Sequence, residues 1–219
     1  MISYLAFASG DDDDDGGGGG REEQQALLGS MVLTEDDTSG LSLIEASRSF
    51  STNEESAQGT RDPAETLAQF EAWGRQLGLS VAFLPDSQAT GQRTFLGVQS
   101  DASLYEDAQG CSLSYSHDVD LAEEADWAGS FPELTEVEVT EITPDNVGEE
   151  VYWVRVSGVT SDGQNLQIVD QVVFRVGNVR AFLRADAQYL ANAPRNSGEG
   201  QVLFWAQVMA DRAEAGATG

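Results

Sequence analysis

Charged side chains on strand-like segments of the second half are the first residues whose types and spacing could hold a ligand. Asp162-Gly163 and Gly177-Asn178 have the composition of two-residue hairpin turns. They join segments 151–159, 166–176 and 179–187. The register that these turns impose places Arg155 opposite Asp170. Such a pair could anchor a ligand, and the alternative is that the two charges only neutralise each other within the sheet.

The same register divides the side chains of these strands between two faces. One face carries Trp153 and is predicted to be core, and the other carries Phe182. Three arginines would line the rim of the second face: Arg175, Arg180 and Arg184. Arginine suits anionic ligands, although local carboxylates are the alternative partners in an acidic chain. A pocket between the sheet and the helices would be lined by Trp153, Phe182 or Trp205.

Nucleophilic catalysis has few candidate residues. His117 is the single histidine and lies between Ser116 and Asp118, but no G-x-S-x-G signature accompanies it. We interpret His117 as a solvated side chain, and Cys111, the single cysteine, as a core residue. No catalytic residue and no cofactor is assigned. A hydrolase with an unrecognised active site stays as an alternative.

An acidic tract near the N-terminus matches the ligand spacing of an EF-hand loop. Asp11, Asp13, Asp15, Gly16 and Glu22 fit D-x-D-x-D-G-x5-E. A run of aspartates followed by a run of glycines produces this match by composition alone, and Gly18 stands where an apolar anchor is needed. The sequence therefore predicts no metal site.

Hydrophobic periodicity predicts an α+β fold with a mostly antiparallel sheet. The C-terminal three-strand meander belongs to that sheet, and about three helices pack against it. Asp62-Pro63 is a helix start signal, with Gly78 in the C-cap position. Helices are expected at 21–33, 62–77, 105–127 and 199–213. Further strands are expected at 41–50, 80–84, 93–104 and 134–142, with a polar loop at 51–61.

The first twenty residues resemble an export signal followed by a tether. Ala6-Phe7-Ala8 fits a secretory cleavage site, and Asp and Gly runs follow it. Residues 1–8 lack a basic residue, so either the n-region lies upstream or the match is chance. We expect residues 1–8 to be a signal-peptide remnant, 9–21 a flexible linker, 22–214 a single globular domain and 215–219 a disordered tail. The expected location is extracytoplasmic or secreted, and the alternative is cytoplasmic.

The charge of the chain excludes some partners. The 219 residues contain 38 Asp and Glu against 11 basic residues, all arginine, which gives a net charge of −27. Such a field repels nucleic acid and anionic membranes. No run approaches the ~18 apolar residues of a membrane span. One cysteine allows no intrachain disulfide.

Two passages are similar to passages in uncharacterised bacterial exported or lipoprotein-like proteins: 62–74 (DPAETLAQFEAWG) and 103–110 (SLYEDAQG). Ser9 stands where a lipoprotein would have Cys. The layout also resembles PsbP-like and kinase-sensor-type extracytoplasmic domains. These resemblances imply an exported, non-enzymatic domain that binds or senses an unknown small ligand or a partner protein. A cytosolic acidic interaction module is the further alternative.

Overall fold

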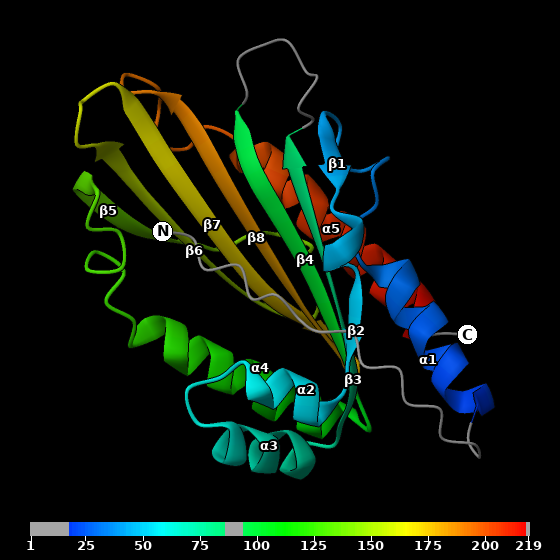
Figure 1. The fold of residues 1–219 in the computed structure, drawn as a ribbon. Helices are drawn as coiled ribbons and strands as arrows, with labels where there is room; N and C mark the ends of the chain where they lie inside the picture. The colour runs from blue at the N-terminus through cyan, green and yellow to red at the C-terminus, as the bar shows by residue number, and fades with distance from the viewer. Residues whose placement is uncertain (1–17, 86–93, 218–219) are drawn as a thin grey trace.

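The computed structural model describes residues 18–85 and 94–217. Within these ranges the chain forms an eight-stranded antiparallel sheet and five α-helices (Figure 1). The strands are β1 Leu41–Leu43, β2 Ser49–Ser51, β3 Arg75–Pro85, β4 Phe95–Tyr105, β5 Leu134–Ile142, β6 Glu150–Thr160, β7 Asn165–Val176 and β8 Val179–Leu190. The helices are α1 Gly18–Met31, α2 Asn53–Gln58, α3 Pro63–Ala72, α4 Ala108–Glu123 and α5 Glu199–Ala217. The strand order is β1-β3-β4-β8-β7-β6-β5, and β2 pairs with β3.

The predicted α+β class and the C-terminal meander are confirmed. β6, β7 and β8 pair in sequence order through the two predicted hairpin turns. Arg155 lies opposite Asp170, and Arg175 lies opposite Arg180. Gly163, the second residue of its turn, has a φ of 72°, and Gly177, the first residue of its turn, has a φ of 55°. A residue with a Cβ atom rarely adopts such positive φ values.

Several predicted boundaries in the first half are wrong. α3 starts at Pro63 as expected, but it ends at Ala72 because Gly74, at φ 65°, reverses the chain. The expected C-cap, Gly78, lies inside β3 instead. The expected loop at 51–61 contains α2, whose start is a capping box between Thr52 and Glu55.

Two helices reach beyond the expected domain limits of residues 22 and 214. α1 begins at Gly18, within the expected linker, and α5 runs to Ala217, within the expected tail. Residues 1–17, including most of the acidic tract, lie outside the described ranges. No helix in the described part of the chain is long and apolar enough to cross a bilayer.

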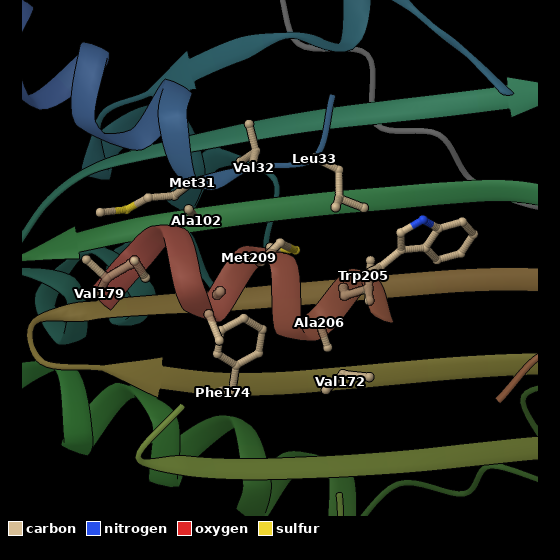
Figure 2. Close-up of a cluster of buried hydrophobic side chains, with 14 of the residues drawn as sticks. Met31, Val32, Leu33, Ala102, Val172, Phe174, Val179, Trp205, Ala206 and Met209 are labelled. Atoms are coloured by element: carbon tan, nitrogen blue, oxygen red, sulfur yellow. The ribbon is translucent and has the colours of Figure 1, made fainter. Parts of the chain in front are cut away.

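The main hydrophobic core lies between one face of the sheet and the helices α1 and α5 (Figure 1). In Figure 2, Trp205, Ala206 and Met209 of α5 face the strands, close to Phe174 and Val172 of β7. The predicted inward side of this helix is confirmed, because these three residues are at most 2% exposed. Trp205 also donates a hydrogen bond from Nε1 to the Asp37 carbonyl at 2.8 Å, which ties α5 to the turn after α1.

The opposite face of the sheet is partly covered by α4, which contacts β4, β7 and β8 and lies near α2 and α3 at one end of the sheet (Figure 1). This helix begins at Ala108 and ends at Glu123, and is shorter than the predicted 105–127. Asp107 caps it by accepting a hydrogen bond from the Gly110 amide at 2.8 Å.

Candidate ligand-binding site

A cavity of about 380 Å³ lies between α4 and the face of β4, β6, β7 and β8 that is turned away from α1 and α5. Its walls combine aromatic and aliphatic side chains with a few charged and polar ones. The lining residues are Asp101, Asp118, Leu121, Ala122, Trp127, Tyr152, Val154, Gln171, Val173, Arg180 and Phe182. An apolar space with a few converging polar groups is the usual form of a small-molecule site.

The path of α4 creates this cavity. In its first half, the buried residues Gly110, Cys111 and Ser114 are small, so the helix approaches the sheet closely. A Cβ atom on Gly110 would lie 1.9 Å from the carbonyl oxygen of Trp73, so only glycine permits this approach. Ser114 Oγ is also hydrogen-bonded to Tyr105 Oη at 2.7 Å. The second half of the helix lines the cavity and does not fill it.

Aromatic residues from two parts of the chain line the cavity. Trp127 follows α4 and donates a hydrogen bond from Nε1 to the Ala122 carbonyl at 2.8 Å, which fixes the indole ring. Tyr152 reaches the cavity from β6. Burial raises the pKa of Tyr152, and the negative charges of Glu141 and Glu123 raise it further, so its hydroxyl is neutral and can donate a hydrogen bond.

Arg180 is paired with α4. Its Nε lies 2.9 Å from Asp118 Oδ2, and its Nη1 donates to Ser114 Oγ at 3.3 Å. The Nε atom is buried without a hydrogen bond to any described residue, so its contact with Asp118 is purely ionic. Burial alone would lower the pKa of Arg180, but the charge of Asp118 raises it above its ordinary value. The pair therefore holds the middle of α4 on β8.

Asp101 of β4 is held by neutral donors. Ser80 Oγ donates to Oδ1 at 2.5 Å, and Gln99 Nε2 donates to Oδ2 at 2.8 Å. Within the ranges that the structure describes, no arginine lies within ion-pair distance of this carboxylate. Burial raises the pKa of Asp101 to about 6, although the two hydrogen bonds and the charge of Arg180 favour the ionised form.

The structure brings together two of the eight residues that the sequence analysis singled out. Phe182 and Arg180 line the cavity. Trp153 and Trp205 are 1% and 2% exposed and do not line it, because both lie in the core on the other face. Of the three aromatic residues predicted as alternatives for the lining, this cavity therefore has Phe182.

The other four charged residues have local partners. Arg155 and Asp170 form a buried two-point contact, from Nε to Oδ1 at 2.8 Å and from Nη2 to Oδ2 at 3.0 Å. Arg175 pairs with Glu149 and Glu150. Arg184 pairs with Asp186 at 3.0 Å.

Residues that the sequence analysis missed form much of the site. Asp101, Trp127, Gln171 and Asp118 were not singled out as ligand-binding residues, yet all four line the cavity. A signal for Asp101 exists in the sequence. Gln99, Asp101 and Ser103 occupy alternate positions of this segment, which indicates one fully polar strand face.

The nucleophilic candidates lie outside the cavity lining. The His117 ring packs against Trp73 with ring centroids 5.2 Å apart and the ring planes inclined by 50°. No hydrogen bond found in the described ranges joins His117 to a hydroxyl or a carboxylate. Cys111 is fully buried, and burial raises the pKa of its thiol to about 12, which suppresses the reactive thiolate. Among the described residues no three His, Cys, Asp or Glu side chains converge as a metal ion requires.

Comparisons with known proteins leave the chain unassigned. No protein family and no curated protein sequence matches it. A solved structure with a similar arrangement is the extracellular domain of PknH from Mycobacterium tuberculosis. The TM-score is 0.44 with 9% sequence identity, over 84% of this chain and 95% of that domain. Values this low place the chain in no family.

Proposed function

We propose that this domain binds a small ligand in the cavity between α4 and the sheet, without chemical conversion of the ligand. The observation that carries the proposal is the cavity itself, about 380 Å³ in volume, with Trp127, Tyr152 and Phe182 among its walls. A volume of this size is within the ~300–1,000 Å³ range of ligand sites in proteins.

The groups around the cavity support binding over catalysis. Asp118 is neutralised by Arg180, and Asp101 is oriented by Ser80 and Gln99. General acid–base or nucleophilic chemistry needs a base within hydrogen-bond reach of a nucleophile. The hydrolase alternative gains no support at His117, which packs on Trp73.

The proposal includes an extracytoplasmic location for the domain. It depends on the cleavage-like Ala6-Phe7-Ala8 and on the Asp and Gly tract after it. Mass spectrometry of the chain expressed in its native host tests this part. A mature N-terminus at Ser9 is expected, and an intact Met1 on the functional protein would overturn the location but not the binding site.

Filling the cavity tests the binding site. Ala122 lines the cavity from α4, so Ala122→Trp places an indole inside it. The control is Leu113→Trp, because Leu113 is on the same helix, 50% exposed and outside the lining. The probe is Nile red, a neutral apolar dye whose fluorescence increases in apolar sites.

We expect saturable one-to-one binding of Nile red to the wild type and to Leu113→Trp, and at least roughly tenfold weaker binding to Ala122→Trp. Circular dichroism checks that both variants are folded. Equal dye binding by the two tryptophan variants, or no saturable binding by the wild type, contradicts the proposal.

A further inference from the structure

We propose that the cavity selects an organic cation, an ammonium group carried on an aromatic or aliphatic body, with the Asp101 carboxylate as its anchor. This inference rests on the proposed function, because it names the ligand class of the same cavity. Three features of the structure support it: the occupied arginines, the free acceptor capacity of Asp101 and the aromatic walls.

The arginines near the cavity are already occupied by carboxylates. Arg180 pairs with Asp118 and Arg184 pairs with Asp186. Arg175, farther along the same face, pairs with Glu149 and Glu150. An anionic ligand would have to displace a carboxylate of the protein from each of these guanidinium groups. The lining therefore presents no uncompensated positive charge.

Within the described residues, Asp101 is the carboxylate of the lining that forms no ion pair, because Arg180, whose charge also acts on it, pairs with Asp118. Each of its oxygens accepts one described hydrogen bond from a neutral donor, Ser80 or Gln99, and a carboxylate oxygen can accept two. An ammonium group brings both the opposite charge and several N–H donors. Such charge-assisted hydrogen bonds are stronger than those from neutral donors.

One aromatic ring lies next to this carboxylate, and two more line the cavity. Phe182 is the direct cross-strand neighbour of Asp101, and both line the cavity. Directly opposed residues of antiparallel strands have Cβ atoms ~5 Å apart. Tyr152 and Trp127 complete the aromatic part of the wall. Cations are attracted to the faces of such rings, and the apolar body of the ligand would pack on Val154 and Val173.

The field around the cavity also favours cations. Three exposed acidic residues follow Asp118 in the sequence: Asp120 and Glu123 in α4, and Glu124 directly after it. The chain as a whole has a net charge of −27. A negative field of this kind raises the local concentration of cations and repels anions.

The anchor makes the binding pH-dependent. Charged and polar groups surround Asp101 on each neighbouring element: Ser80 of β3, Gln99 of β4, Arg180 and Arg184 of β8, and Asp118 of α4. Asp186, farther along β8, lies opposite Gly97 and pairs with Arg184. Because the pKa of Asp101 is about 6, its charge is lost as the pH falls through that value. Binding of an amine that stays protonated should weaken over the same range.

Three probes of similar shape separate the ligand classes: 2-phenylethylamine, 2-phenylethanol and 3-phenylpropanoate. Isothermal titration calorimetry at pH 7.5 should give at least roughly tenfold tighter binding of the amine than of the alcohol, and the weakest binding for the carboxylate. Between pH 7.5 and pH 5 the amine should lose most of this advantage, while the alcohol should bind as before.

Two neutralising variants show whether Asp101 is responsible. Asp101→Asn should reduce amine affinity to that of the alcohol and leave the alcohol unchanged. Asp211→Asn is the matched control, because it removes the same charge from an exposed position on α5, beyond the opposite face of the sheet. This control should keep the selectivity of the wild type.

The outcomes distinguish the inference from the proposed function. If Nile red binds and is blocked by Ala122→Trp, but the amine has no advantage over the alcohol, the cation inference is overturned and the binding site remains. Preference for the carboxylate, or equal loss of amine affinity in Asp101→Asn and Asp211→Asn, also overturns the inference. If none of the three probes binds and Ala122→Trp leaves the affinity for Nile red unchanged, the proposed binding site itself is overturned.

Discussion

The two faces of the sheet use the same strands and produce different surroundings. On the face of α1 and α5, Phe174 and Leu183 are 0% exposed, and the core there is continuous. On the face of α4, Phe182 borders a cavity. Strand alternation supplies large apolar residues to both faces, so the difference comes from how closely the helices approach. Dense packing of one face gives the fold stability, while the other face keeps the space in which we propose that a ligand binds.

The contrast is sharpest between two carboxylates, one on each face. Asp170 accepts a hydrogen bond from Trp153 Nε1 at 2.7 Å as well as the two from Arg155. Asp101 has hydrogen bonds from Ser80 and Gln99 and no ion pair within the described ranges. A buried carboxylate held by a two-point contact with one arginine and by a further N–H donor is part of the packed interior. One that keeps its charge among neutral donors costs stability, which suggests that it serves another purpose.

Neutralising Asp170 should have the largest effect on the stability of the protein. Asp170→Asn leaves the Arg155 guanidinium, 4% exposed, without its main counter-charge. Glu199, at 3.2 Å and 41% exposed, compensates for little of this loss. We expect the free energy of unfolding to fall by about 4 kcal/mol, measured by urea denaturation at pH 7.

A double variant shows whether this loss comes from the orphaned charge. Arg155→Met with Asp170→Leu replaces both charges by apolar groups of similar size. It should be more stable than Asp170→Asn, because no buried charge is left unpaired. If the double variant is the less stable of the two, the Arg155–Asp170 ion pair contributes net stability. The loss in Asp170→Asn would then not come from the unpaired charge, and the contrast drawn between Asp170 and Asp101 would fail.

Much of the framework was predictable from local sequence. Asp162-Gly163 and Gly177-Asn178 determine two hairpins, and two-residue turns leave little freedom in register. The Arg155–Asp170 pair therefore followed from the turns. The inward side of α5 followed from helical periodicity at Trp205 and Met209.

The cavity was harder to predict, because it depends on distances between elements. Gly110 permits a contact with the Trp73 carbonyl that is far away in sequence, and that contact sets where α4 leaves the sheet. Sequence periodicity shows which side of a helix is apolar, but it does not show the gap beneath the helix. The predicted helix 62–77 continues past Gly74, although the φ of 65° at this glycine ends α3 at Ala72. The short α2 was missed although Thr52 and Glu55 carry its capping signal.

Neutralising Asp101 at the cavity should have a smaller effect on stability, and of the opposite sign. Burial raises the pKa of Asp101 from 3.8 to about 6 in the folded state, so the folded protein holds a proton that the unfolded chain releases between these values. The contribution of this group to stability is therefore favourable at acid pH and is lost as the pH rises from about 4 to 6. Asp101→Asn removes the charge that has to be buried at neutral pH.

Asp101→Asn should accordingly be more stable than the wild type by about 1–2 kcal/mol at pH 7, after allowance for partial solvent screening and for a weaker contact with Gln99. The advantage should disappear near pH 4, where Asp101 is neutral in both states. Urea denaturation of both proteins at pH 4, 5, 6 and 7 measures it, and the difference between the two curves cancels the other acids. A variant that is less stable than the wild type at pH 7 would place Asp101 with Asp170 in the framework. A more stable variant that also loses amine binding would show that the fold tolerates a destabilising charge at the place where its ligand is held.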